Sequence, residues 1–409
     1  MKLLILTQYY PPETGAAQNR LHDLAKRLKA KGAEVSILTA MPNYPKMKVF
    51  DGYRHSCYKK EIIEGITIRR SWIYVKNSRS IFHRLLNYFS FVFTSLFTGL
   101  FRTPRPDYIL CESPPLFLGI SAFILSRVKG ARLIFNISDL WPESAEKLGL
   151  IRSRFLLGMS SKLEMFLYRK SYLITGQTKG IVANISQRMP GKTVHWLPNG
   201  AEPDVYDPAK FNNMLWRCEN GFDPDDFLVF YGGILGHAQG LEVILLAAEL
   251  LKSHEKIKFV IMGSGPCREE LIEMKNKMGI NNVVFFDSSP KAKMPEVLAS
   301  VDVSLIPLRK LDLFKGAIPS KIFESLAMKK PIILGVEGEA RSLFIEDARC
   351  GVAYTPDDYA DLAQKVLLLS GDGEKLLALG AAGREYVKLN FDRKMIADDF
   401  YGILSGMVS

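Results

Sequence analysis

The stretch that best indicates the fold runs from residue 316 to residue 331: Gly316-Ala317-Ile318-Pro319-Ser320-Lys321-Ile322-Phe323-Glu324-Ser325-Leu326-Ala327-Met328-Lys329-Lys330-Pro331. Ser320 favours a helix N-cap, apolar residues follow it at helical spacing, and Pro331 ends the run before an apolar strand. A helix start beside Lys321 suits a phosphate or diphosphate, and Glu324 could accept hydrogen bonds from sugar hydroxyls. An ordinary capped helix with a surface lysine and glutamate explains the same pattern, so both interpretations stay open.

The length and composition bound the class of protein. A chain of 409 residues with 47% hydrophobic content predicts two or three globular domains. The five cysteines are scattered and form no Cys-x-x-Cys pair, so neither a zinc site nor a disulfide framework is indicated, and a reducing cytoplasm fits. The apolar run after Met1 is too short for a signal peptide and predicts the first strand.

The net charge of +11 is distributed unevenly along the chain. Residues 1–200 carry 30 Lys and Arg against 12 Asp and Glu, a balance of +18, and the totals leave 24 against 31, or −7, for residues 201–409. A basic half predicts an anionic membrane surface or a nucleic acid as partner, and a solvated basic face is the alternative. Basic residues surround the unusual segment 85–101, which favours the membrane over nucleic acid.

The segment 85–101 carries no charge for 17 residues and is flanked by arginines. Its length is marginal for a transmembrane helix, and Asn, Ser and Thr residues dilute its apolar character. A core helix and an interfacial helix in contact with a membrane are the two main alternatives, and both can hold on one helix.

Short apolar runs alternate with amphipathic helical patterns throughout the chain, which predicts doubly wound parallel sheets of the α/β class. The alternation starts afresh after residue 200, so we expect two Rossmann-like domains, 1–200 and 201–385, with a C-terminal helix at about 385–409 packing back on the first. Open α/β sheets bind ligands at the carboxyl ends of their strands. Two such domains facing each other predict a ligand cleft between them.

Three strand-to-helix turns contain glycine, at residues 10–17, 232–240 and 263–266. Glycine lets backbone N–H groups approach a phosphate without obstruction by a Cβ atom. None of the turns matches Gly-x-Gly-x-x-Gly with a distal acidic residue or a Walker loop, which argues against a dehydrogenase or an NTPase. His237 is either a polar loop residue or a contact to phosphate or sugar.

The residues 135–144 leave a predicted strand and carry Asp139 and Glu143 into a loop at its carboxyl end. A helix cap at Ser138 or Asp139 with Trp141 packing beneath it explains the pattern. A functional position explains it equally well, because polar loop residues at strand ends often bind ligands.

These motifs together resemble the family 4 glycosyltransferases, which are retaining, nucleotide-sugar-dependent enzymes of the GT-B fold. The resemblance covers nearly the whole chain and rests on the first glycine loop, the Pro-Asn-Gly crossover, the Gly-x-Gly-Pro turn, the strand end that holds the base and the nucleotide-sugar helix, at residues 9–15, 197–202, 262–266, 285–286 and 319–327. The sequences at 139–144 and 235–241 are most similar to O-antigen and capsule transferases, including those of N-acetyl-L-fucosamine.

The resemblance implies roles for individual residues. Lys321, Glu324 and Asp139 are the catalytic candidates. Donor binding is implied for Gly15, Gly233, Gln239, Gly265, Phe286, Ser320, Lys321 and Glu324. Acceptor or sugar contacts are implied for Glu13, Ser138, Glu143 and His237. Backbone amides at Gly15, Gly233 and 320–322 would stabilise the leaving diphosphate together with Lys321, so no metal and no cofactor beyond the UDP-sugar substrate is expected.

The sequence also departs from the family pattern. The first of two glutamates spaced eight apart falls on Gly316, so recognition of the donor sugar must differ here. The usual Arg and Lys of the second glycine loop fall on Ile234 and Gln239, and the usual His before Asp139 is Ser138. Lys321 is the natural replacement for the two missing cations, with Arg309 or Lys310 in reserve.

The resulting expectation is a hexosyltransferase that moves a sugar, best assigned as N-acetyl-L-fucosamine, from UDP to a polyprenyl-diphosphate-linked acceptor in O-antigen or other surface polysaccharide (lipopolysaccharide) synthesis. It would act in the cytoplasm, as a peripheral protein on the inner face of the membrane, through its basic N-terminal domain. A UDP-sugar 2-epimerase-like enzyme on a similar fold and a non-catalytic membrane- or nucleic-acid-binding protein are the alternatives.

Overall fold

The computed structural model of the chain describes residues 1–13, 15–44, 47–78, 80–147 and 153–406. Its contacts divide the chain into two units, Met1–Asn199 with Arg393–Ser409, and Gly200–Asp392. Each unit is an α/β domain on a predominantly parallel sheet, which confirms the predicted fold class. The chain returns to the first unit at Arg393, later than the expected residue 385, because helix α14 (Gly373–Asn390) packs on helix α11 (Lys321–Ala327) of the second unit.

The first unit is built on an eight-stranded sheet of order β3-β4-β2-β1-β5-β6-β7-β8. Its strands are β1 Lys2–Leu6, β2 Glu34–Ala40, β3 Tyr58–Ile63, β4 Ile66–Ser71, β5 Tyr108–Ser113, β6 Arg132–Ile137, β7 Leu173–Gly176 and β8 Val194–Trp196. All neighbours pair in parallel except β3 and β4, which are antiparallel. Central strands such as β1 and β5 are almost entirely buried, since helices cover both faces of the sheet.

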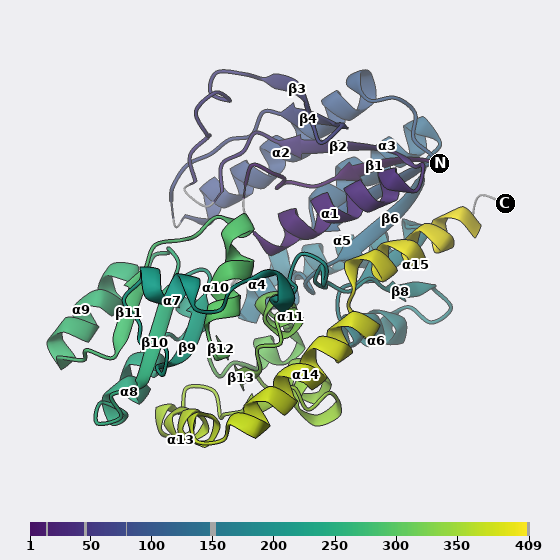
Figure 1. The fold of residues 1–409 in the computed structure, drawn as a ribbon. Helices are drawn as coiled ribbons and strands as arrows, with labels where there is room; N and C mark the ends of the chain where they lie inside the picture. Colours follow the sequence, from purple (N-terminus) through teal and green to yellow (C-terminus); the bar gives the residue numbers. More distant parts are fainter. Residues whose placement is uncertain (14, 45–46, 79, 148–152, 407–409) are drawn as a thin grey trace. The chain divides into compact units, whose positions relative to one another are not determined.

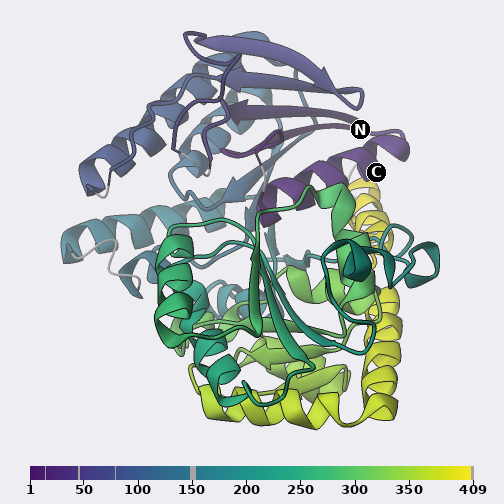
Figure 2. The ribbon, with the colours of Figure 1, turned by 60° about the vertical axis from the view of Figure 1, so that its left-hand side comes forward.

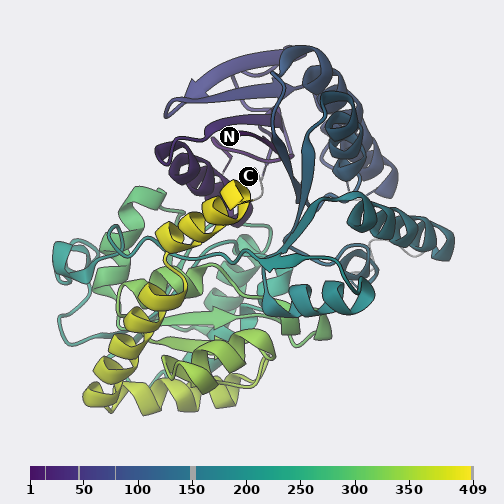
Figure 3. The ribbon, with the colours of Figure 1, turned by 90° about the vertical axis from the view of Figure 1, so that its right-hand side faces the viewer.

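Helices α1 (Ala16–Ala30) and α15 (Arg393–Gly406) share one hydrophobic cluster with this sheet. Figures 1 and 3 show the C-terminal α15 lying beside α1. A second cluster involves the other helices, which are α2 Ile81–Arg102, α3 Leu118–Lys129, α5 Arg154–Lys170 and α6 Lys179–Arg188. The short α4 (Glu143–Lys147) follows β6. The C-terminal segment is therefore an integral part of the first unit.

The apolar segment 85–101 forms most of α2. Phe91 is buried against the sheet, so the helix contributes to the core. Other aromatic side chains of the same helix are exposed, with Phe97 at 63% and Phe101 at 78%. The two alternatives drawn from the sequence thus concern different faces of one helix. No helix among the described residues is long and apolar enough to cross a membrane.

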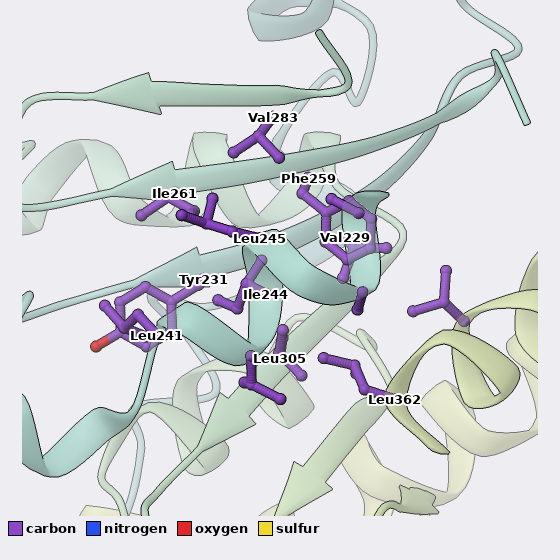
Figure 4. Close-up of a cluster of buried hydrophobic side chains, with 14 of the residues drawn as sticks. Val229, Tyr231, Leu241, Ile244, Leu245, Phe259, Ile261, Val283, Leu305 and Leu362 are labelled. Atoms are coloured by element: carbon purple, nitrogen blue, oxygen red, sulfur yellow. The ribbon is translucent and has the colours of Figure 1, made fainter. Parts of the chain in front are cut away.

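The second unit is built on a six-stranded parallel sheet of order β11-β10-β9-β12-β13-β14. Its strands are β9 Phe227–Gly232, β10 Ile257–Met262, β11 Val283–Phe286, β12 Val303–Pro307, β13 Ile332–Gly335 and β14 Gly351–Ala353. Figure 4 shows how side chains of β9 and β10 interdigitate with those of the helix after β9 to form the core on one face.

Different helices cover the two faces of this sheet. Those packed on the core of Figure 4 are α8 Glu242–Leu250, α9 Arg268–Met278 and α13 Tyr359–Ser370. On the other face, α10 (Met294–Ser300) and α11 (Lys321–Ala327) line a cavity together with β9 and β12. The remaining short elements are α7 Leu215–Glu219, α12 Glu339–Arg341, η1 Pro208–Lys210, η2 His237–Gln239, η3 Lys291–Lys293, η4 Asp312–Gly316 and the π-helix η5 Ser342–Asp347. Figure 2 shows α13 and α14 following each other along one edge of the unit.

In the second unit, the glycine turns 232–240 and 263–266 cross each other with their backbones in direct contact. A Cβ on Gly263 would lie 1.8 Å from the carbonyl oxygen of Gly233, and one on Gly265 would lie 2.3 Å from that of Leu235. Hydrogen bonds lock the crossing, since the Leu235 amide donates to the Ser264 carbonyl and the Cys267 amide to the Leu235 carbonyl, both at 2.9 Å. Close backbone approach therefore explains these glycines without any ligand.

We predict that Gly263→Ala lowers the free energy of unfolding by roughly 3–5 kcal/mol, because the backbone it would strike is itself hydrogen-bonded and cannot yield. Gly158→Ala is the matched control: nothing lies within 4 Å of its added Cβ, and helix α5 should gain about 0.5–1 kcal/mol. Urea unfolding of both variants measures the difference. Equal stability of the two would contradict the crossing.

Candidate functional site

Lys321 occupies the most unusual electrostatic position among the candidates of the second unit. Its Nζ lies 3.8 Å from the centroid of the Tyr231 ring, and a Cβ on Gly233 would come within 2.9 Å of it. Desolvation lowers the pKa of Lys321 to about 7, while the nearby Glu324 carboxylate opposes the shift. Within the described residues no carboxylate forms an ion pair with it, so the ammonium has an aromatic face in place of a bonded anion.

A cavity of about 40 Å³ lies beside this amine. Lys321, Glu324 and Ser325 of α11 line it, opposite Met294 and Leu298 of α10. A ligand pocket needs several hundred Å³, so this space is far too small for a nucleotide sugar. The cavity therefore marks a gap in the packing beside Lys321 and is no donor pocket by itself.

Helix α11 is held firmly at its far end. The buried guanidinium of Arg384 on α14 donates to the carbonyl of Ala327, the last residue of α11, and to the carbonyl of Tyr206 at 2.7 Å. Phe323 packs against Phe344 and Phe391, with ring centroids 5.7 and 4.9 Å apart. This packing fixes the helix that carries Lys321.

The start of α11 differs from the expected capped helix. Ser320 already has helical φ and ψ angles, and its side chain forms no cap hydrogen bond. The Ile322 amide donates to the Pro319 carbonyl at 3.1 Å, and the Gly233 amide donates to the Met262 carbonyl at 2.9 Å. The amides of Ile322 and Gly233 are therefore engaged within the fold, which leaves the Lys321 side chain as the better candidate for an anion.

The other donor-site candidates of this unit lie on the two crossing loops and at the end of β11. His237 and Gln239 share the loop after β9, where His237 Nδ1 lies 3.2 Å from Cys267 Sγ and Gln239 folds back over Gly236. The Phe286 ring packs on Trp216 and Phe222, and its carbonyl accepts from the Gly263 amide. Gly265 lies at the backbone crossing described above.

In the first unit, Glu13 braces the loop that follows β1. Its Oε1 accepts from the amides of Asn43 and Tyr44 at 2.8 and 2.9 Å, and its Oε2 accepts from the amide of Tyr10 at 3.1 Å. Only 1% of the residue is exposed. The structure thus gives Glu13 an internal structural role, and the expected sugar contact stays a prediction. Gly15 precedes α1 as its N-cap residue.

The candidates after β6 lie close together. Asp139 is an exposed residue, and its Oδ1 accepts from the Ser144 hydroxyl at 2.6 Å, which orders the turn into α4. Partial desolvation by surrounding groups raises the pKa of Asp139, although the Ser144 hydrogen bond opposes the shift. Glu143 lies 3.6 Å from Arg188. Trp141 packs on Phe117, so the structural and the functional interpretations of this segment are compatible.

A buried polar network behind Ser138 was missed in the sequence. Arg20 Nη2 of α1 lies 2.7 Å from Glu112 Oε1 of β5 and 2.8 Å from Ser138 Oγ, with all but a few per cent of the ion pair buried. Asn136 and Ser138 also donate to the Glu112 carboxylate, and Thr175 donates to Asn136 at 2.6 Å. The sequence did contain a signal for this network, because each of two otherwise apolar strands carries a polar residue near its end. These residues are Glu112 in β5 and Asn136 in β6.

A further residue that sequence reasoning assigned only a reserve role is Arg309. Its Nη2 donates to both oxygens of Glu242 at 2.9 Å, and its Nε donates to the His237 carbonyl at 3.3 Å. This guanidinium ties the loop after β12 to the loop after β9. Lys321 therefore carries the less engaged of these two positive charges. As for metals, the described part of the chain contains no group of three or more His, Cys, Asp or Glu side chains suited to hold an ion.

Known families match both halves of the chain. Residues 15–200 match the family described as Glycosyl transferase 4-like domain, and residues 213–386 match Glycosyl transferases group 1. The chain is a glycosyltransferase of the GT-B fold. The match confirms the resemblance to family 4 glycosyltransferases, while the sugar specificity stays a prediction.

Individual relatives of this glycosyltransferase extend the comparison. The putative colanic acid biosynthesis glycosyl transferase WcaI of Escherichia coli K12 is 27% identical over 427 residues, covering 99% of this chain and 100% of the relative. A GDP-mannose-dependent alpha-(1-6)-phosphatidylinositol monomannoside mannosyltransferase of Mycobacterium tuberculosis is 25% identical over 227 residues, covering 53% and 57%. The solved structure of Anabaena Alr3699/HepE in complex with UDP and glucose has a TM-score of 0.73 at 17% identity and covers 99% of both chains, a likeness of fold.

We predict that Arg20→Ala in the buried network lowers the free energy of unfolding by about 3–5 kcal/mol, because it leaves the Glu112 carboxylate buried without its cation. Lys26→Ala on the same helix is the matched control. Its ion pair with Glu64 is half exposed, so its loss should cost at most about 1 kcal/mol. Equal losses in thermal or urea unfolding would contradict the internal role of Arg20.

Proposed function

We propose that this glycosyltransferase moves a sugar from a UDP donor to a polyprenyl-diphosphate-linked sugar acceptor, with retention of the anomeric configuration. The reaction would serve the synthesis of a surface polysaccharide on the inner face of the cytoplasmic membrane. The whole-length similarity to WcaI, whose name refers to colanic acid biosynthesis, supports the polysaccharide role. The UDP and UDP-glucose complexes of HepE, a protein of the same fold, support a uridine donor.

The single observation that carries the proposal is the desolvated amine of Lys321. An ammonium held over the Tyr231 ring, with its pKa lowered to about 7, is only partly charged in the free protein at neutral pH. A diphosphate beside it would restore the proton and gain a strong charge-assisted hydrogen bond. The site is therefore poised for an anion that arrives with a ligand.

The reaction itself would use this charge at the moment of bond cleavage. The bond between the anomeric carbon and the diphosphate oxygen breaks, a bond to the acceptor hydroxyl oxygen forms, and the hydroxyl proton passes to an oxygen of the departing diphosphate. Negative charge grows on the departing UDP, where the preorganised Lys321 ammonium stabilises it more than it stabilises the bound donor. Glu324, one turn further along α11, would bind donor hydroxyls. No metal is required in this scheme, and turnover in the presence of EDTA should equal that in its absence.

Recognition of the donor sugar must rest on other groups than the family's first glutamate. Gly316 at the corresponding position is exposed, and nothing lies within 4 Å of a Cβ built on it. A donor without a hydroxyl that needs this carboxylate suits the site, and N-acetyl-L-fucosamine, a 6-deoxy sugar, remains our best assignment.

A donor panel tests the proposal directly. The purified chain is incubated with UDP-hexoses, UDP-N-acetylhexosamines, their 6-deoxy forms and GDP-sugars, each with and without a polyprenyl-diphosphate-linked acceptor, and nucleotide release is measured. We expect acceptor-dependent release of UDP and an α- or β-linkage that matches the donor anomer by NMR. Preference for GDP-sugars would overturn the uridine assignment. Conversion of the donor without acceptor would indicate an epimerase.

Lys321→Ala should lower kcat by roughly 100-fold to 1,000-fold, the usual cost of losing one preorganised donor to a developing anion. In the wild type, the donor KM should rise as the pH increases above about 7, since the neutral amine no longer attracts the diphosphate. Lys321→Arg should remove this rise, because a guanidinium stays protonated throughout the range. Steady-state kinetics between pH 6 and 9 measure both effects.

Lys330→Met is the control for replacing a desolvated lysine in the same unit. Burial lowers the pKa of Lys330 to about 8, and its Nζ donates to the Ala299 carbonyl at 2.8 Å. This variant should lose stability and keep its donor KM. A Lys321→Ala enzyme that turns over within about threefold of the wild type, under 1 kcal/mol of barrier, would refute the diphosphate role.

Glu324→Ala should raise the donor KM by about tenfold or more, because a carboxylate that accepts hydrogen bonds from donor hydroxyls is lost. Glu324→Gln keeps the acceptor oxygen and should recover part of the loss. Initial rates at saturating acceptor separate KM from kcat. An unchanged KM in both variants would move donor hydroxyl binding to another residue.

A further inference from the structure

The outer face of α2 is aromatic. Large apolar side chains stand exposed at residues that fall within about 100° of the helix circumference, and they are Phe82, Leu86, Phe93, Phe97 and Phe101. We call these five residues the aromatic face. Phe97 and Phe101 stack on each other with ring centroids 6.4 Å apart. An exposed stripe of this length exceeds the scattered apolar side chains that are normal on a protein surface.

The inner face of the same helix is partly polar. Asn87 accepts from Gln8 at 2.9 Å, Ser95 donates to Ser121 at 3.0 Å, and Thr98 accepts from Ser71 at 2.8 Å. All three side chains are buried in the first unit. A helix between water and a protein core would carry its polar side chains on the outer face and its apolar side chains on the inner face. The arrangement therefore indicates that the environment outside α2 is apolar when the protein works.

Helix α5 continues this surface with a mixed pattern. Phe155, Met159 and Phe166 are exposed, and Lys162 stands between them on the same helical face. The Phe123 ring of α3 meets that of Phe166 at 5.0 Å, and α3 also packs on α2. The helices α2, α3 and α5 thus form one continuous layer.

The charge of this layer is almost entirely positive. Its basic residues are Arg84, Arg102, Arg127, Lys129, Arg154, Lys162, Arg169 and Lys170. The only acidic residue in the three helices is Glu164, which is buried and paired with Arg188. Aromatic side chains interleaved with lysine and arginine are the composition of segments that lie in the interface of an anionic bilayer.

We propose that the aromatic face of α2, together with the exposed residues of α5, is the surface through which the first unit docks on an anionic lipid bilayer. The aromatic side chains would enter the boundary between headgroups and acyl chains, and the basic residues would contact lipid phosphates. Charge selects this occupant over a second copy of the chain, because a symmetric dimer through this layer would bring like charges together. The inference stands on these contacts and is independent of the sugar that the enzyme transfers.

Vesicle flotation with the full chain tests the inference. Vesicles of phosphatidylcholine and phosphatidylglycerol are compared with vesicles of phosphatidylcholine alone, at low salt and at about 1 M salt, where the Debye length falls to about 3 Å. We expect the wild type to float with anionic vesicles at low salt. The double variant F97S/F101S should bind at least tenfold more weakly, and K162E/R169E should lose the preference for anionic lipid.

The control L377S/L389S replaces two exposed leucines of α14 in the second unit and should float like the wild type. Thermal unfolding should show that all variants are folded, since every replaced side chain is at least partly exposed. Turnover of a UDP-sugar without vesicles is measured in parallel and should not change, so docking and catalysis can fail separately. Absence of wild-type flotation at low salt would overturn the inference. So would undiminished flotation of F97S/F101S, or a loss of dimerisation in that variant as its only effect.

Discussion

The second unit is organised around one desolvated positive charge. Lys321 is carried by a helix that aromatic packing and the Arg384 guanidinium hold in place, and its amine lies against Tyr231 and the loop at Gly233. That loop is fixed in turn by its backbone crossing with the turn at Gly263. A rigid surrounding is what makes a lone ammonium useful, because preorganised charge stabilises a developing anion without reorganisation at the moment of reaction.

In the first unit, buried charges are paired with one another, in contrast to the amine of Lys321, which forms no ion pair with a carboxylate of the described residues. Arg20, Glu112 and Ser138 satisfy one another in the interior, so this network supports the ends of β5 and β6 and offers little to a ligand. Glu13 is likewise saturated by three backbone amides. The exposed Asp139 at the end of β6 is the residue that such a support would present to an acceptor. The positive charge on the outer helices of the same unit is the charge that we propose contacts lipid phosphates.

Under the proposed function, the enzyme handles substrates of two kinds. A soluble nucleotide donor needs a small, fixed anion site, which one amine and a few loops supply. A lipid-linked acceptor needs a protein that stays at the bilayer, and the inverted polarity of α2, with Asn87 inside and Phe97 outside, suits that requirement. The two tasks use separate parts of the chain, so they can be altered independently.

The sequence by itself determined the fold class, the strand-helix alternation and the motifs that indicate a family 4 glycosyltransferase, because these depend on local periodicity and on residue types at fixed spacing. It also indicated Lys321 as a candidate to bind a diphosphate, and it predicted that segment 85–101 is a core helix, an interfacial helix in contact with a membrane, or both. Only the tertiary structure decided that Glu13 is internal, that Gly263 serves a backbone crossing, and that Arg20 meets Glu112 across 92 positions of sequence. Those outcomes depend on which distant groups desolvate or satisfy one another, and no local pattern records such contacts.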